Sequence, residues 1–134
     1  MQESIECSII LPVNTEQLYS AWLDTAAHTA FTGSSADIDP RLGGRFTAWD
    51  GYIEGVTLEL EPYRRILQAW RTSEFPEGSS DSRLEILLED AGHGQTRLRL
   101  LHSEIPAGQG ESYLQGWEDY YFQPMLEYFL RPRE

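Results

Sequence analysis

The sequence contains no lysine, a single cysteine and only three histidines. A Schiff-base mechanism is therefore excluded, because it needs a lysine amine. Cys7 cannot form a disulfide within the chain, which agrees with a reducing compartment, so we expect a cytoplasmic location. The widely spaced histidines and the lone thiol match no metal-ligand spacing, and we expect neither a metal site nor a cofactor.

Long apolar runs and an excess of cationic side chains are also missing. No segment has enough consecutive apolar residues to span a bilayer, and residues 1–11 alternate polar with apolar residues, unlike a signal peptide. All ten cationic residues are arginines, and the formal net charge is −12. Such a surface repels phosphate groups, so we expect binding to neither nucleic acids nor membranes. Nucleophile-elbow, phosphate-loop and dinucleotide motifs are absent.

What the sequence does contain is one strongly amphipathic segment near its end, from Glu111 to Leu130. At about 100° per residue, its apolar side chains gather on one wide, aromatic stripe. The stripe consists of Leu114, Trp117, Tyr121, Met125 and Tyr128, widened by Phe122, Leu126 and Phe129. This pattern predicts a single long helix with a buried aromatic face. Pro124 lacks a backbone donor and would clash with the carbonyl of Tyr120, so we expect a kink centred there.

The preceding segments alternate with period two, which is typical of strands. Residues 4–11 form the first predicted strand; Asn14 then caps a helix over residues 15–24, and a short helical turn ends at Gly33. Six further strands are predicted at residues 35–39, 45–49, 52–61, 65–72, 82–89 and 95–103. Asp50-Gly51 is a strong hairpin signal, and Val56, Leu58 and Leu60 share one face of their strand.

With 134 residues and 40% hydrophobic content, the chain is long enough for one domain, which we place over residues 1–134. Consecutive hairpins predict an antiparallel sheet. Helices at the two ends of the strand series predict an α+β domain with the helices on one face.

Several motifs in this order carry a resemblance to a known family. They are GGRF from Gly43, GVTLELEPYRRILQAWR from Gly55, GHGQTRLRL from Gly92, and the GW pair at Gly116. The chain resembles the activator of heat-shock protein 90 ATPase homologue family, within the helix-grip (SRPBCC) class that also contains START domains, birch-pollen-type allergens and polyketide cyclases. The resemblance implies a curved seven-stranded antiparallel sheet wrapped around the C-terminal helix, short helices after the first strand, and a cavity between sheet and helix.

The candidate ligand-binding residues are those predicted to face that cavity. The apolar candidates are Trp22, Phe31, Phe46, Trp70, Trp117, Tyr121 and Met125, which could equally fill a core. His102 extends the apolar face of Leu98 and Leu100, where it could contact a ligand, act as a base or be structural. Glu118 could pair with it or reach water at the rim.

These residues are compatible with three functions. The first is a binding module for a hydrophobic, aromatic or acyl small molecule, without obligatory chemistry. The second is a cyclase- or hydratase-like enzyme that uses His102 and a carboxylate. The third, implied by the family alone, is regulation of a chaperone or another partner. A homodimer is also open, because Trp49, Tyr52 and Tyr120 could form an exposed aromatic patch.

Overall fold

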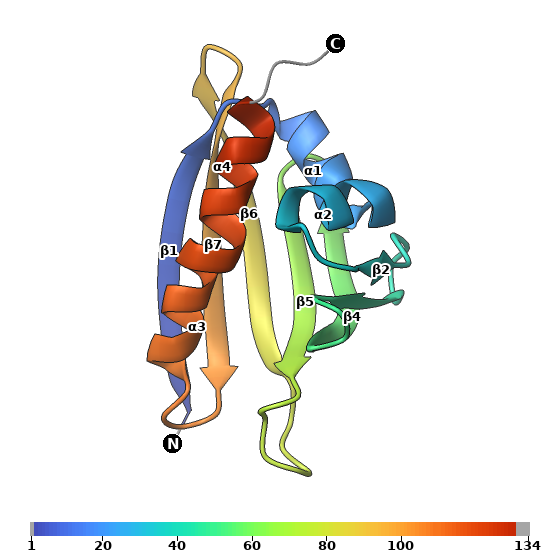
Figure 1. Ribbon diagram of the computed structural model, residues 1–134, viewed down its shortest axis with the longest axis vertical. Helices are drawn as coiled ribbons and strands as arrows, with labels where there is room; N and C mark the ends of the chain where they lie inside the picture. The colour runs from blue at the N-terminus through green and yellow to red at the C-terminus, as the bar shows by residue number, and fades with distance from the viewer. Residues whose placement is uncertain (1, 131–134) are drawn as a thin grey trace.

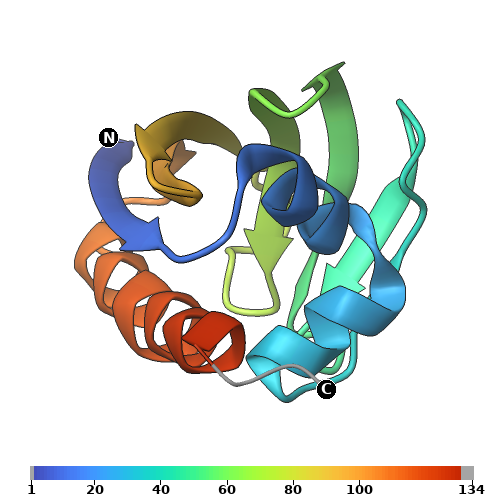
Figure 2. The same ribbon diagram turned by 90° about the horizontal axis from the view of Figure 1, so that it is seen from above.

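The computed structural model describes residues 2–130, in which a seven-stranded antiparallel sheet curves around a C-terminal helical column (Figures 1 and 2). The strand order across the sheet is β1-β7-β6-β5-β4-β3-β2. The strands are β1 (Glu3–Leu11), β2 (Asp37–Ile38), β3 (Arg45–Ala48), β4 (Ile53–Glu61), β5 (Arg65–Thr72), β6 (Ser82–Gly92) and β7 (Gln95–Ile105). The predicted α+β helix-grip fold is confirmed.

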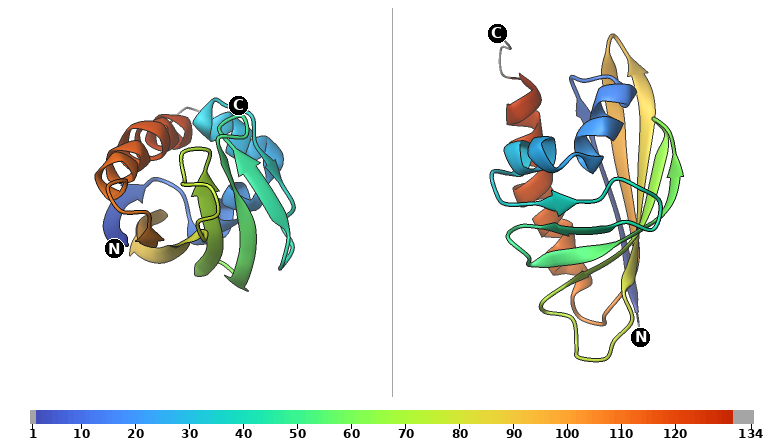
Figure 3. Two further views of the ribbon diagram at one scale, coloured as in Figure 1. Left: turned by 90° about the horizontal axis from the view of Figure 1, so that it is seen from below. Right: turned by 90° about the vertical axis from the view of Figure 1, so that its right-hand side faces the viewer.

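All helices lie on one side of the sheet, as the right-hand view of Figure 3 shows. They are α1 (Thr15–Leu23), α2 (Thr25–Thr32), α3 (Gly110–Trp117), a π-helical segment η1 (Glu118–Phe122) and α4 (Gln123–Leu130). The Asn14 side chain accepts a hydrogen bond from the Gln17 amide at 2.8 Å, which confirms the predicted cap. No helix in the described part of the chain is long and apolar enough to cross a membrane.

The predicted long C-terminal helix is confirmed, but its middle is π-helical, so it is not α-helical throughout. Two α-helices are joined by η1, in which the amide of Gln123 bonds to the carbonyl of Glu118, five residues back. In a regular helix, the ring of Pro124 would clash with the carbonyl of Tyr120. Tyr120 lies inside the wider π turn, which ends two residues before Pro124. Leu114, predicted on the buried stripe, is 38% exposed.

The core fills the space between the concave face of the sheet and the helices. Leu84, Ile86 and Leu88 of β6 are buried, as their alternation predicted. Val56, Leu58 and Leu60 do not share one face of β4. Thr57 is fully buried and Leu58 is 39% exposed, whereas Leu60 packs against the core, so the inward face reverses within the strand. A register shift between Thr57 and Glu59 accompanies this reversal.

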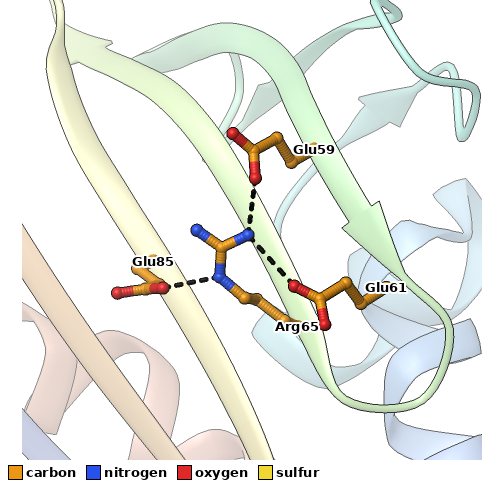
Figure 4. Close-up of polar contacts among 4 residues, drawn as sticks. All are labelled: Glu59, Glu61, Arg65 and Glu85. Atoms are coloured by element: carbon orange, nitrogen blue, oxygen red, sulfur yellow. Dashed lines mark hydrogen bonds and ion pairs between the residues drawn. The ribbon is translucent and has the colours of Figure 1, made fainter.

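An ion-pair network surrounds one arginine on the solvent side of β4, β5 and β6 (Figure 4). Arg65 Nε donates to Glu85 Oε2 at 2.5 Å, and its Nη1 donates to Glu59 Oε1 at 2.7 Å and to Glu61 Oε2 at 3.3 Å. Its hydrogen bonds to the carboxylates of Glu59 and Glu85 raise the pKa of the Arg65 guanidinium. One arginine therefore holds three of the many surface carboxylates.

Candidate functional site

A pocket of about 440 Å³ opens between α3–η1 and the end of the sheet formed by β3, β4 and β5. Its volume lies within the range of small-molecule sites, which is roughly 300–1,000 Å³. Seven of its eleven lining residues are aromatic. The lining consists of Trp49, Tyr52, Ile53, Trp70, Glu74, Ser112, Tyr113, Gly116, Trp117, Tyr120 and Tyr121.

One wall of the pocket is the tight turn between β3 and β4. The pairing of Ala48 with Ile53 confirms the hairpin predicted from Asp50-Gly51. Trp49 has a φ of 52°, an uncommon left-handed conformation for a bulky residue. Its ring meets Tyr120 of η1 edge-on, with centroids 5.4 Å apart and planes at 67°. This contact holds the turn against the helical column and so closes one side of the pocket.

A chain of polar groups follows the rim of the pocket. The Tyr52 hydroxyl donates to the Glu74 carboxylate. The Tyr113 hydroxyl donates to Gln109 Oε1 at 2.7 Å, so the 2.6 Å contact with Thr72 Oγ1 makes the threonine the donor there. Gln109 Nε2 donates to the Glu74 backbone carbonyl at 2.9 Å, which joins the two halves of the rim. Burial raises the pKa of Tyr52 and of Tyr113, and Glu74 raises that of Tyr52 further, so both phenols stay protonated.

Trp117 in the pocket wall is fixed from behind by His102. The indole Nε1 donates to His102 Nδ1 at 3.2 Å, and an indole nitrogen can only donate. His102 must therefore carry its proton on Nε2, which donates to Ser82 Oγ at 2.9 Å; that hydroxyl donates to the Trp70 carbonyl at 2.7 Å. Burial lowers the pKa of His102 to about 3. The imidazole is a neutral structural group in a fixed tautomer.

Tyr121 is fixed by a second buried histidine. His28 Nδ1 donates to the carbonyl of Trp22 at 2.9 Å, so Nε2 accepts from the Tyr121 hydroxyl at 2.8 Å. Burial lowers the pKa of His28 to about 4, although the bond to Trp22 acts in the opposite direction. Two neutral histidines therefore orient two of the aromatic rings that line the pocket.

The predicted site residues occupy four different environments. Trp70, Trp117 and Tyr121 line the main pocket. Trp22 and Phe46 line a second cavity of only about 10 Å³, which Trp70 and Tyr121 also border. The candidates that border neither cavity are Phe31, His102 and Met125, all packed in the core, and Glu118, exposed on η1.

The remaining lining residues were missed as site residues. Trp49, Tyr52 and Tyr120, candidates for an exposed interface patch, come together at the pocket instead. The sequence indicated only that these aromatic residues are exposed, because Trp49 and Tyr52 flank a hairpin turn and Tyr120 lies on the polar side of a helix. Glu74 and Tyr113 carry no periodic signal that distinguishes them from an ordinary loop or core residue.

The arrangement gives no support to an acid–base mechanism through His102. Both of its ring nitrogens are engaged by Ser82 and Trp117, and within residues 2–130 no carboxylate bonds to it. Cys7 is half-buried in β1, and burial raises its pKa to about 12, so a thiolate nucleophile is disfavoured. Among the same residues, no three His, Cys, Asp or Glu side chains could hold a metal ion.

A protein-family model described as "Activator of Hsp90 ATPase homolog 1-like protein" matches residues 12–129. The chain belongs to this family. Activator of 90 kDa heat shock protein ATPase homolog 1 from Homo sapiens is 31% identical to it over 114 residues, 85% of this chain and 33% of that protein. An uncharacterized protein from Schizosaccharomyces pombe is 32% identical over 114 residues, 84% of this chain and 33% of that protein. The chain thus spans about a third of the length of these relatives.

Solved structures of the activator family and of related proteins share the fold. An HSP90 activator from Plasmodium falciparum superposes with a TM-score of 0.85 at 25% identity, covering 98% of this chain and 99% of that one. CalU16 from Micromonospora echinospora gives a TM-score of 0.77 at 27% identity, covering 98% and 78% of the two chains. The Aha1 dimer from Colwellia psychrerythraea has the same fold at 14% identity and a TM-score of 0.76, covering 96% and 97%.

Proposed function

We propose that this domain of the activator family binds a hydrophobic small molecule, with an aromatic or acyl body, in the pocket between α3–η1 and the sheet. The single observation that carries the proposal is the wall of seven aromatic side chains around about 440 Å³. Aromatic rings offer large apolar contact areas at little conformational cost. Because buried histidines orient Trp117 and Tyr121, much of the wall is preformed rather than assembled by a ligand.

The test is a thermal-shift screen of aromatic and acyl compounds, followed by titration of any stabilising compound. Tyr120→Ala removes a lining ring that is already 58% exposed, so the fold should tolerate it. Tyr63→Ala is the matched control, because Tyr63 is 44% exposed and lies in the β4–β5 turn, outside the lining. A ligand present at 100 times its Kd should stabilise the native domain by about 2.7 kcal/mol.

We expect that stabilisation to weaken in Tyr120→Ala and to persist in Tyr63→Ala. Equal effects of the two substitutions would place the ligand elsewhere. Failure of every compound class to shift the melting temperature would count against the pocket as a ligand site.

Membership of the activator family favours a second candidate, regulation of a chaperone ATPase. The supporting observation is the 31% identity to a human activator, of which this chain matches about a third. The test is the ATPase rate of purified Hsp90 with and without the domain. An ATPase rate that does not change at a saturating concentration of the domain would refute chaperone regulation by the isolated chain. Light scattering in the same buffer would test the homodimer, which the Colwellia psychrerythraea Aha1 dimer favours.

A further inference from the structure

The pocket wall carries charge of only one sign. Of its eleven lining residues, all within the described part of the chain, Glu74 alone is charged at neutral pH. The chain has no lysine, and no arginine within residues 2–130 belongs to the lining. Arg71, on the neighbouring strand β5, is engaged by Asp81 Oδ1 at 2.8 Å and by the Ser79 carbonyl at 2.9 Å. An anionic ligand would find no cationic partner in this wall, whereas a cation would find a carboxylate.

The tyrosine hydroxyls of the wall are largely engaged by the protein itself. Tyr52 donates to Glu74, Tyr113 to Gln109, and Tyr121 to His28. These three phenols therefore offer a ligand their rings rather than their protons. A ring presents a negative face, and a cation near that face is attracted by the quadrupole.

Two of the three tryptophans in the pocket wall likewise offer a ligand no hydrogen-bond donor. The Trp117 Nε1 donates to His102. The Trp49 Nε1 is buried, and it has no hydrogen-bond partner among the described residues. Because this nitrogen is shielded even from water, it offers no donor to a ligand. Tryptophan has the most favourable ring for a neighbouring cation.

We propose that the pocket selects an organic cation, a small ammonium compound with a hydrophobic body, held by Glu74 and the surrounding ring faces. This inference rests on the proposed ligand-binding function and names the chemical class of the ligand. The net charge of −12 acts in the same direction, because it raises the local concentration of cations around the domain.

Three matched probes test the proposal: benzyltrimethylammonium, its uncharged carbon isostere neopentylbenzene, and the anion benzylsulfonate. Binding would be followed by the fluorescence of the pocket tryptophans and by calorimetry, in 150 mM salt so that distant charges are screened. We expect the cation to bind about tenfold more tightly than the isostere, and the anion not to bind.

Two variants of one loop locate the charge effect. Glu74→Gln keeps the shape of the rim and should weaken the cation at least threefold while leaving the isostere unchanged. Glu77→Gln makes the same change of charge at an exposed position of the same loop, outside the lining, and should alter neither affinity. Tyr120→Ala should weaken both the cation and the isostere.

The outcomes separate this inference from the proposed function. If the isostere or the anion binds as tightly as the cation, and Tyr120→Ala weakens it, the pocket is a ligand site and the cation preference is refuted. If Glu74→Gln and Glu77→Gln weaken the cation equally, the preference comes from the general acidity and the Glu74 site is refuted. If no probe binds, both proposals are overturned.

Discussion

Two buried histidines should make this fold sensitive to mild acid. His28 is 4% exposed and His102 is 1% exposed, and burial lowers their pKa values from 6.5 to about 4 and about 3. In the unfolded chain both imidazoles regain the higher value, so below pH 6.5 the unfolded state binds more protons than the folded state. The stability that the two neutral imidazoles contribute is therefore fully present above pH 6.5, and it is lost as the pH falls toward their pKa values in the folded state.

The size of this loss follows from the shifts. A group that protonates only in the unfolded state costs about 1.4 kcal/mol per pH unit below its unfolded pKa. Between pH 8 and pH 5, each histidine should therefore cost about 2 kcal/mol, and the pair about 4 kcal/mol. Small domains typically have 5–15 kcal/mol of stability, so a loss of this size is easily measured.

The assay is urea denaturation at pH 8, 6.5 and 5 at constant ionic strength. His28→Gln and His102→Gln each remove buried hydrogen bonds and should be less stable at every pH. Each should nevertheless lose about 2 kcal/mol less than the wild type between pH 8 and pH 5. His93→Gln, in the exposed β6–β7 turn, keeps both buried imidazoles and is the control.

Acidification also changes the repulsion between like charges in a chain with a net charge of −12. This effect is common to the wild type and the variants, so it cancels when they are compared at the same pH. If both buried variants lose stability as steeply as the wild type, the reasoning is refuted. An NMR titration of the folded wild type gives an independent check, since neither buried ring should titrate above pH 5. In the folded protein the rings protonate only toward pH 4 and pH 3, which would release Tyr121 and Trp117, so ligand affinity should persist at pH 5 and fall below it.

Three further substitutions test the frame around the pocket. Gly55→Ala would place a Cβ 1.9 Å from the Ala69 carbonyl oxygen, so we expect urea denaturation to show a loss of about 3 kcal/mol or more. Arg65→Met should cost about 1–2 kcal/mol by losing the 2.5 Å bond to Glu85 and leaving three carboxylates facing one another, and 1 M salt should reduce the difference. Glu3→Gln replaces the carboxylate that accepts hydrogen bonds from two backbone amides at the start of α3 with a weaker, uncharged acceptor, so hydrogen exchange should accelerate in that turn. Those amides lower the pKa of Glu3, so the difference between Glu3→Gln and the wild type should begin to shrink below pH 4.5 and disappear once the pH falls below the lowered pKa.

The architecture was predictable because its signals are local. Period-two alternation, the Asp50-Gly51 turn and the Asn14 cap each specify one element, and consecutive hairpins allow few sheet topologies. The β4 strand shows the limit of that logic. Its alternation placed Leu58 and Leu60 on one face, but a register shift beside Thr57 leaves Leu58 exposed and Leu60 against the core, and no local pattern marks the shift.

The π-helical middle of the final helix escaped prediction for a related reason. A projection at 100° per residue assumes unbroken α-helical geometry, and the π turn of η1 changes the phase between its two halves. Pro124 correctly indicated an irregularity, although it could not show that the break would be a π turn instead of a simple kink. Tyr120 and Tyr121, adjacent in η1, both line the pocket.

The site itself depends on contacts that no segment encodes alone. The β3–β4 turn supplies Trp49, the β5–β6 loop supplies Glu74, and α3 supplies Tyr113, so the pocket exists only where three distant segments meet. Alternation along β7 placed His102 inward, and that much is correct. It could not show that Trp117 would occupy one ring nitrogen and Ser82 the other. The difference between a catalytic base and a structural support is therefore decided by two hydrogen bonds across the fold, and this is why the pH dependence of stability tests the assignment more directly than any activity screen.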